Sequence, residues 1–504
     1  MRILYIDIDS QRPDHLGCYG YHRNTTPAID AIAAEGVRCT GVYASDAPCL
    51  PSRTAFYSGR FGIHTGVVGH GRTAADPKPQ GPSRVFKDWF TTQGLADQLR
   101  RAGFHTAMIS PFGDRHSAHH FYAGFNEIHN TGKNGGESAE DVRPVMERWF
   151  DTNAANDNWY LHINFWDPHT DYRVPEDYGQ PFENDPPPAH LDDEQLIARH
   201  RKKTGPHSAQ DLGMYQPARP DRHPRAVEAL TDRASMKHWI DGYDTAVRYV
   251  DDHIQWMVDK LKAEGVYEDT AIIISADHGE NQGELGIYGE HGTADHATCN
   301  IPMIVKWPGG RQGEVDDGLH YHLDWAPTVL DLLGVDRKPA IWDGQSYAGV
   351  IMAGQGPVDG RESLVLSQCC HVCQRSVRFG PWLYIRTFHD GFHLFPDEML
   401  FDLESDPHEQ QDVAPDHPQI CGEAARKLIA WHSEQMWKMA DHGSDVVDPM
   451  WTVVREGGPF HATHNARRFA SPLPDYLDRL EKTHRADGAD ALRQRYGHYL
   501  PVSS

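Results

Sequence analysis

The amino-acid sequence predicts an α/β fold with a mostly parallel central sheet, followed by a smaller C-terminal domain with an antiparallel sheet. Three apolar runs of strand length support the central sheet, at residues 3–9, 159–165 and 270–276. Residues 226–264 precede the last run and place apolar side chains three and four positions apart, which is typical of a helix packed on a core. Strands that alternate with helices favour a parallel sheet.

The first strand ends in two carboxylates. Asp7 and Asp9 are two positions apart, so both side chains point to the same side of the strand. Because open parallel sheets bind ligands at the carboxyl ends of their strands, the pair indicates a metal site. The alternative is that the two acids cap the turn that follows.

Cys49 lies just before a short helical pattern at residues 54–59. There its side chain faces unpaired backbone N–H groups and the positive end of the helix dipole, and Arg53 adds a cation one turn further on. This setting suits an anion and makes Cys49 a candidate precursor of a nucleophile. The local chemistry equally fits a buried structural cysteine at a strand-to-helix turn.

The run at residues 270–276 ends directly before Asp277 and His278. An acid and an imidazole side by side at a strand exit are good metal ligands, although Asp-His-Gly alone is a weak pattern. Together with Asp9 and Cys49, they predict one metal site built from residues far apart in the sequence.

The glycine-rich loop after the Cys49 helix can bring histidines close to a bound anion, and His70 is the candidate. A surface-loop histidine is the alternative.

The chain divides into a predicted catalytic domain, residues 1–354, and a C-terminal α+β subdomain, residues 355–440. Within the first, residues 170–225 are rich in Pro, Asp, His and Arg and long for a passive connection, so we expect a lid that faces the substrate. Residues 441–504 form a charged extension that is more typical of an oligomer arm than of a catalytic element. We therefore expect a homo-oligomer.

The composition of the chain limits the classes of binding partner and the cellular location that we expect. The chain has 504 residues and a formal net charge of −24, which argues against nucleic acid or an anionic membrane. The apolar run at the N-terminus is short for a signal peptide, and the 8 cysteines show no paired framework, so we expect a cytoplasmic protein with reduced thiols. A mature secreted chain is the alternative. Residues 369–373, Cys-Cys-His-x-Cys, are more compact than usual zinc motifs, which favours buried thiols.

Several motifs together resemble one known family. Cys49-Leu50-Pro51-Ser52-Arg53 and the residues that continue it, Thr-Ala-Phe-Tyr-Ser-Gly-Arg, are similar to the signature of the type I sulfatases. Residues 9–14 resemble that family's Asp-Asp-x-Arg-Pro-Asp, with Ser10 in place of the second Asp, and residues 401–409 resemble the stretch that closes the sheet of its C-terminal domain. The resemblance covers roughly residues 1–440.

The resemblance implies the fold and the cofactors. The fold is the alkaline-phosphatase-like sandwich. A formylglycine-generating enzyme oxidises Cys49 to formylglycine, whose hydrate is the nucleophile, and one divalent metal is held by Asp9, Asp277, His278 and the modified Cys49. This chain has Ser10 in place of an Asp and His278 where relatives have Asn. Fewer carboxylates and one imidazole favour Mn²⁺ over Ca²⁺. The resemblance leaves Asp7 open as a further ligand.

The resemblance also implies roles around the metal. Arg53 neutralises charge on the ester, His169 or His291 protonates the leaving oxygen, and His70 or a neighbour acts as base. The lysine that many sulfatases carry after their next strand is absent. Arg115 and His116 are candidates to replace its charge, with a helix start or a loop as the alternative. His296 competes with His291, and either also fits a solvated loop.

The implied substrate is a small anionic ester, with sulfate esters first and phosphonate monoesters or phosphodiesters second. The second class enters because that lysine is missing, and so is a second one that the family often carries in an Arg-Tyr-Lys-Tyr stretch, where this chain has Pro381-Trp382-Leu383-Tyr384. A non-catalytic anion-binding or metal-binding protein with an unmodified Cys49 is the alternative from a different class.

Overall fold

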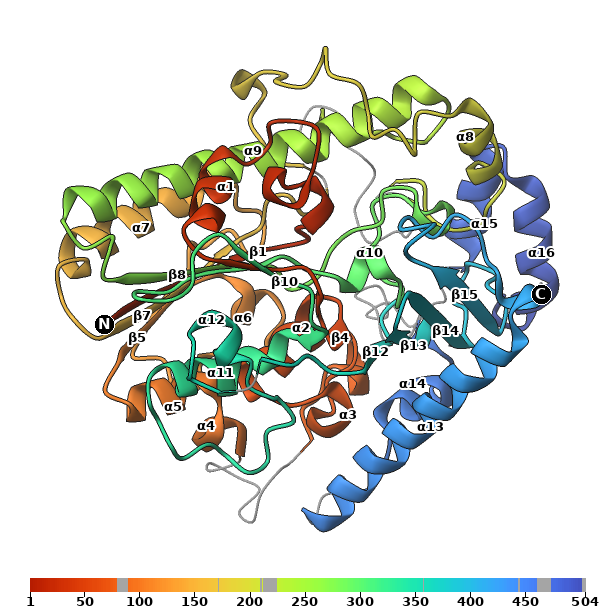
Figure 1. Cartoon of the computed structure of the whole chain (residues 1–504). Coiled ribbons are helices and arrows are strands. Elements are labelled where there is room, and N and C mark those ends of the chain that lie inside the picture. Colours follow the sequence, from red (N-terminus) through yellow and green to blue (C-terminus); the bar gives the residue numbers. More distant parts are fainter. Residues whose placement is uncertain are drawn as a thin grey trace.

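The computed structural model describes the chain apart from residues 79–88, 171, 209–210, 212–223, 357, 443–444, 460–472 and 501–504. Most of the described residues form two sheets with helices around them (Figure 1). Parts of the predicted lid and of the predicted C-terminal extension lie outside the described residues. Among the helices that can be assessed, none is both long and apolar enough to cross a membrane.

The large sheet has eight strands in the order β10-β2-β9-β8-β1-β7-β5-β6. Its strands are β1 (Arg2–Ile8), β2 (Val37–Cys39), β5 (His105–Ile109), β6 (Glu127–His129), β7 (Trp159–Phe165), β8 (Thr270–Ser275), β9 (Met303–Lys306) and β10 (Glu314–Asp316). The pairs of β1 with β7 and with β8 are parallel, and β9 is antiparallel to both of its neighbours. The predicted mostly parallel central sheet is confirmed.

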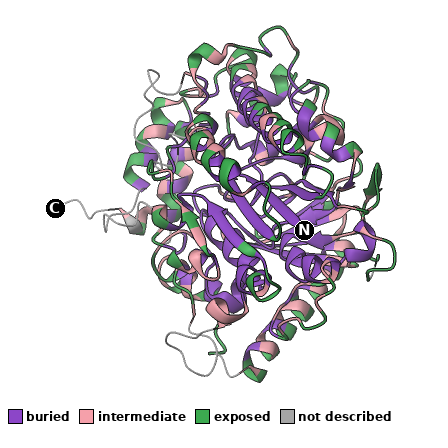
Figure 2. Ribbon diagram, turned by 90° about the vertical axis from the view of Figure 1, so that its left-hand side faces the viewer, coloured by how far each residue is buried: buried purple, intermediate pink, exposed green. Residues whose placement is uncertain are grey.

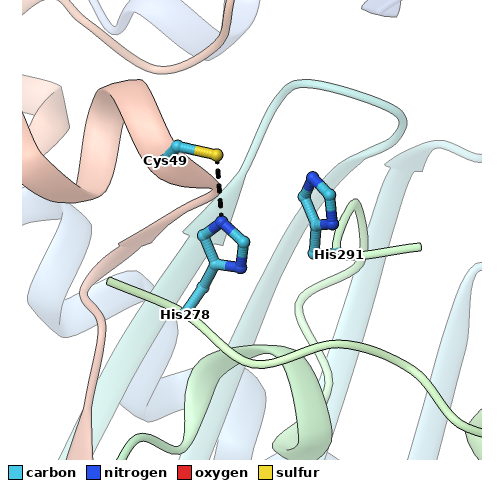
Figure 3. A group of neighbouring side chains, drawn as sticks. All are labelled: Cys49, His278 and His291. Atoms are coloured by element: carbon cyan, nitrogen blue, oxygen red, sulfur yellow. Dashed lines mark hydrogen bonds between the residues drawn. The ribbon is translucent and has the colours of Figure 1, made fainter. Parts of the chain in front are cut away.

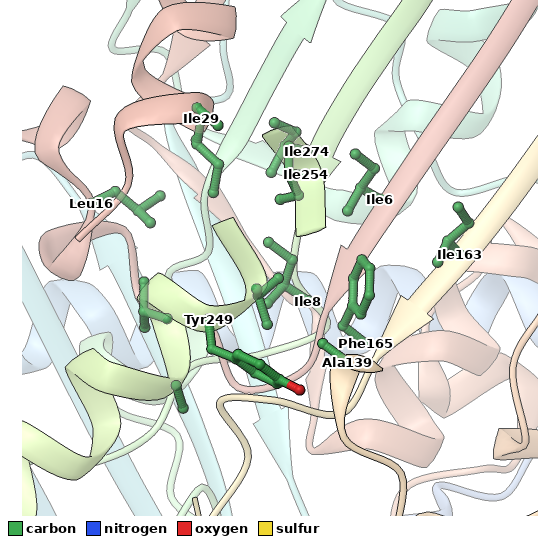
Figure 4. Close-up of a cluster of buried hydrophobic side chains, with 14 of the residues drawn as sticks. Ile6, Ile8, Leu16, Ile29, Ala139, Ile163, Phe165, Tyr249, Ile254 and Ile274 are labelled. Atoms are coloured by element: carbon green, nitrogen blue, oxygen red, sulfur yellow. The ribbon is translucent and has the colours of Figure 1, made fainter. Parts of the chain in front are cut away.

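Helices cover both faces of this sheet. One face carries α1 (Pro27–Ala34), α7 (Ala139–Asn153) and the long α9 (Arg233–Ala263). Their apolar sides pack on β1, β7 and β8 through residues such as Ile8, Phe165 and Ile254 (Figure 4). The other face carries α2 (Cys49–Ser58), α5 (Leu95–Arg101), α11 (Trp325–Leu332) and α12 (Ala348–Ile351). Figure 2 shows the strands buried between helices whose outer sides are exposed.

Shorter helices connect these layers: α3 (Gly62–Thr65), α4 (Trp89–Gln93), α6 (Phe112–Arg115), α8 (Glu194–His200) and α10 (His296–Cys299). A small two-stranded sheet pairs β3 (Val42–Tyr43) with β11 (His320–Tyr321).

The second sheet has the order β15-β14-β13-β12-β4. The strands β12 (Ser363–Gln368), β13 (Cys373–Phe379), β14 (Trp382–His389) and β15 (Glu398–Asp402) are antiparallel, as predicted. The fifth strand, β4 (Asp46–Ala47), comes from the N-terminal part of the chain and pairs in parallel with β12. Because β4 ends two residues before α2, the second sheet helps to position the start of the Cys49 helix.

Helices α13 (Pro418–Asp441) and α14 (Pro449–Arg455) contact the second sheet. The C-terminal helices α15 (Leu473–Lys482) and α16 (Ala486–Tyr496) form an apolar cluster with Phe392 of the same chain. The oligomer arm predicted for residues 441–504 stays a prediction.

Candidate active site

The carboxyl ends of β1 and β8 bring three carboxylates together. In the parallel register Asp7 lies opposite Ser275. Asp9 follows β1 directly, and Asp277 follows β8 after one residue, Ala276. Both Asp9 and Asp277 are buried. The backbone N–H of Ser10 donates to Asp277 Oδ1 at 3.3 Å, and the Ser10 hydroxyl donates to Asp9 Oδ1 at 3.1 Å. Ser10 therefore orients the two acids.

Arg53 binds all three carboxylates. Its Nε donates to Asp7 Oδ2 at 2.9 Å, and its Nη1 donates to Asp9 Oδ2 at 3.0 Å and to Asp277 Oδ2 at 2.5 Å. Burial raises the pKa of Asp7, but Arg53 and His162 outweigh it and hold that pKa below its ordinary value. Burial raises the pKa of Asp277 well above its ordinary value, and the neighbouring Asp9 adds to this shift. One guanidinium thus does not fully offset three buried acids.

Cys49 lies at the same place. Its Sγ is 3.0 Å from Nε2 of His278, as Figure 3 shows. Burial raises the pKa of Cys49 well above its ordinary value, and Asp9 and Asp277 raise it further. An unmodified thiol here stays protonated, and a protonated thiol is a poor nucleophile.

Polar residues fix the position of helix α2 relative to the end of β8. The Ser52 hydroxyl donates to the backbone oxygen of Asp277 at 2.7 Å, and His322 Nε2 lies 2.9 Å from the backbone oxygen of Ser52. Gly59 ends the helix at φ 66°, a left-handed conformation that favours glycine. These bonds fix Cys49 and Arg53 against the end of β8.

The predicted metal ligands converge. One donor atom from each of Asp9, Cys49, Asp277 and His278 lies within 4.8 Å of the others. Buried carboxylates in excess of their cation, with an imidazole beside them, are a donor set that fits a divalent metal. Asp7, which the sequence left open, is not in this group because it faces Arg53 and His162.

His291 and His169 complete one side of the cluster. The ring of His291 stacks on that of His278 with centroids 4.5 Å apart, and the ring of His169 lies 4.9 Å from His291. The buried Nδ1 of His291 has no hydrogen-bond partner among the described residues. Burial lowers the pKa of His169 to about 3 and that of His291 well below its ordinary value. Both imidazoles are therefore neutral when no anion is bound.

The remaining predicted residues lie on the side of α2. The backbone N–H of Leu50 donates to His70 Nε2 at 3.2 Å, and the rings of His70 and His116 lie 5.1 Å apart. The Arg115 guanidinium lies over the Trp166 ring at 4.6 Å and acts electrostatically on Cys49. The competitor His296 lies elsewhere, with its Nδ1 3.0 Å from the Tyr43 hydroxyl.

Sequence reasoning missed a buried group next to His291. Glu290 Oε1 lies 2.5 Å from His371 Nδ1, and Glu290 Oε2 lies 2.7 Å from His393 Nε2. Burial lowers the pKa of His371, but Cys370 and Glu290 outweigh it and raise that pKa to about 10. His371 is thus a buried imidazolium whose ring lies 6.4 Å from that of His291. The acid-His pair Glu290-His291 and the Cys-Cys-His motif were its local signals.

Comparison with known proteins agrees with this geometry. An uncharacterized sulfatase of Escherichia coli strain K12 is 24% identical over 462 residues, which cover 82% of this chain and 83% of that protein. A choline-sulfatase of Rhizobium meliloti is 24% identical over 77% of each chain. The solved phosphonate monoester hydrolase of Agrobacterium radiobacter superposes with a TM-score of 0.65 at 20% identity, covering 88% of this chain and 96% of that one.

The fold and the buried cluster thus define an ester hydrolase with an alkaline-phosphatase-like α/β sandwich. The sulfatase family model matches residues 2–335, so the chain belongs to the sulfatase family and is a sulfuric ester hydrolase by class.

Proposed function

We propose that the chain hydrolyses small sulfate esters at the cluster around residue 49, with the Cys49 thiol converted to formylglycine by a formylglycine-generating enzyme. The observation that carries the proposal is the position of Cys49, 3.0 Å from His278 and beside Asp9 and Asp277. These neighbours and burial keep a thiol protonated. The hydrated aldehyde supplies a hydroxyl nucleophile and a second hydroxyl with which the enzyme releases sulfate.

Asp9, Asp277, His278 and the modified residue 49 would hold one divalent metal. Two carboxylates with an imidazole favour Mn²⁺, and Ca²⁺ is the alternative. When bound, such a metal lowers the pKa of a hydroxyl on it and neutralises charge on the ester oxygens. The Arg53 guanidinium binds the carboxylate oxygens of Asp9 and Asp277 and so orients them. Its buried Nη2 has no hydrogen-bond partner among the described side chains.

Histidine side chains carry out the proton transfers in this proposal. An anionic ester beside His169 and His291 raises the pKa of both imidazoles, because an opposite charge favours the protonated form. One of them then donates a proton to the leaving oxygen. His70, which contacts the backbone next to residue 49, is our candidate for the base, and Arg115 adds positive charge on its side of the site.

Phosphonate monoester or phosphodiester hydrolysis is the second candidate. Two solved phosphonate monoester hydrolases share the fold, with TM-scores of 0.65 and 0.64. The lysine that many sulfatases carry after the strand that corresponds to β5 is absent here, and Arg115 and His116 are our candidates to replace its positive charge. Homo-oligomerisation and a cytoplasmic location stay predictions.

The deciding experiment combines mass spectrometry with turnover. The peptide that contains residue 49 is isolated from protein of the native host, and turnover of 4-nitrophenyl sulfate and of 4-nitrophenyl phenylphosphonate is measured on the same sample. We expect the mass loss of a thiol-to-aldehyde conversion and faster turnover of the sulfate. The Cys49→Ala variant is the control for background hydrolysis. An unmodified thiol in active protein would overturn the mechanism, and faster phosphonate turnover would favour the second candidate.

A further inference from the structure

A second cavity lies outside the cluster around residue 49. It has a volume of ≈ 510 Å³ and lies between the end of α8 and the second sheet. Its lining combines apolar side chains, called the floor here, with polar and charged side chains, called the rim here. The floor includes Leu196, Ile287, Phe395, Met399 and Phe401. The volume is within the range of roughly 300–1,000 Å³ in which small organic ligands bind proteins.

Three cations line the same cavity: Arg199, Lys202 and Lys203. They belong to the run Arg199-His200-Arg201-Lys202-Lys203 in a chain whose formal net charge is −24. All three are exposed, and in the part of the chain that the structure describes none of them forms an ion pair. Their charge is therefore free to attract an anion from solvent.

Two carboxylates also line the cavity, and backbone amides donate to each of them. Both oxygens of Glu409 lie 3.1 Å from the backbone N–H of His296. Asp412 Oδ1 accepts from the N–H groups of Leu400 at 3.0 Å and Ala414 at 2.9 Å. The three cations thus outnumber the two carboxylates of the lining.

The wall with the cations is fixed in place. Arg485 Nη1 donates to the backbone oxygen of Gly205 at 2.8 Å, and the Tyr476 hydroxyl donates to the backbone oxygen of Thr204. Both donors belong to the C-terminal helical segment, which lies beside α8 in Figure 1. The Lys203 stem packs on Gly286, where an added Cβ would meet Lys203 Cγ at 2.9 Å. A preformed wall lowers the entropy cost of binding.

We propose that this cavity binds an organic anion whose apolar body lies on the floor and whose charged group pairs with Lys202, Lys203 and Arg199. The ligand class is an aryl or alkyl sulfonate, sulfate or carboxylate. Burial of an apolar group against the floor and attraction of a negative charge to the cations both favour binding. His393 lines the cavity and lies 2.7 Å from Glu290, the residue before His291. A ligand in the cavity would therefore lie next to His393, which is connected through Glu290 to His291 in the cluster around residue 49.

The test uses 2-naphthalenesulfonate in isothermal titration calorimetry, on the Cys49→Ala variant so that the proposed chemistry plays no part. We expect one saturable site that a Lys202→Glu/Lys203→Glu change weakens at least about tenfold, since both changed residues are exposed and the fold is retained. Lys482→Glu, an exposed lysine at another place, is the matched charge control and leaves the affinity unchanged. The uncharged 2-naphthalenemethanol should bind much more weakly than the sulfonate.

Equal affinity of the double variant and its parent, equal affinity for the uncharged analogue, or no saturable binding would overturn the proposal. A further arm separates the two sources of such an anion. In the unmutated protein, competitive inhibition of 4-nitrophenyl sulfate turnover would identify the distal part of the substrate as the ligand. Inhibition or activation that added substrate does not relieve would identify a separate organic anion. In both cases the Lys202→Glu/Lys203→Glu variant should no longer show the inhibition or activation by 2-naphthalenesulfonate.

Discussion

His371 Nδ1 lies 2.5 Å from Oε1 of Glu290, so a buried ion pair joins the second sheet to the loop of His291. His371 follows β12 and Glu290 belongs to the loop after β8. His393 occupies the other oxygen of Glu290. Three segments of the chain therefore meet at one carboxylate next to the cluster around residue 49.

The first prediction concerns Glu290→Gln. The pKa of His371 is raised to about 10, so the pair stabilises the fold fully below the unfolded pKa of about 6.5 and loses this as pH rises toward 10. The pKa of Glu290 is lowered to about 2, so its contribution is full above about pH 4.3 and lost as pH falls toward 2. The pair is thus strongest between about pH 4.3 and 6.5. Removing one partner should cost about 3–5 kcal/mol at pH 5.5 and less at pH 9.5.

Denaturant unfolding at the two pH values measures this difference. Glu423→Gln removes an exposed acid that lies 3.6 Å from Lys427 and is the control, with an expected change under about 1 kcal/mol at both pH values. A cost for Glu290→Gln that does not depend on pH would show that His371 is not charged in the folded protein.

A second prediction concerns Gly292→Ala. A Cβ at Gly292 would meet His371 Nδ1 at 2.2 Å and its Cγ at 2.4 Å, and Glu290 holds that ring in place. We expect a loss of about 1–3 kcal/mol in the free energy of unfolding and lower turnover. Gly422→Ala is the matched control, because its nearest neighbour is 3.7 Å away within α13, and it should stabilise by about 0.5–1 kcal/mol. Equal stabilisation by both variants would mean that the ring of His371 moves freely.

Metal removal is the third prediction. Chelation should abolish turnover and lower the melting temperature, because the charge of the metal then no longer offsets buried Asp9 and Asp277, which share the Arg53 guanidinium. Restoring a metal at 100 times its dissociation constant should return about 2.7 kcal/mol of stability. Thermal melts with added Mn²⁺ or Ca²⁺ compare the two ions. Asp9→Asn should lose the response, whereas Asp475→Asn, an exposed acid on α15, should keep it.

The fourth prediction is that Arg53→Lys lowers kcat/KM at least about 10²-fold while the protein stays folded. Lysine keeps the positive charge but cannot reach Asp7, Asp9 and Asp277 at once, as the guanidinium does. Steady-state kinetics measure the loss, and the mass of the residue 49 peptide confirms that the modification is unchanged. Arg100→Lys, at an exposed ion pair, is the control. Near-normal kcat/KM would remove Arg53 from the reaction.

Local patterns predicted the framework well. The strand at residues 159–165 coincides with β7, and the long helical pattern at 226–264 corresponds to α9. That helix begins at Arg233 rather than 226 because Asp232 and Ser235 form a capping box, and apolar periodicity does not locate a cap. The sheet itself follows from the strand and helix alternation.

The residues that we propose as metal ligands could be selected from the sequence because each follows a strand or begins a helix at a recognisable motif. The Cys49 helix itself begins at residue 49, five residues before the helical pattern at 54–59. The Glu290 group could not be selected in this way, since its partners are 81 and 103 residues away and no local pattern joins them. Strand β4 was missed for a related reason. It has two residues, and only its pairing with β12 makes it a strand.

Cys49 is 2% exposed in the folded chain. Any enzyme that modifies its thiol must therefore reach it before β1, β7 and β8 come together over α2. Those strands lie more than a hundred residues apart in sequence, and such long-range pairing forms slowly. If Cys49 is converted as we propose, the yield of active protein depends on the rate of modification relative to the rate of folding, and a substitution that speeds folding would leave more of the chain unmodified.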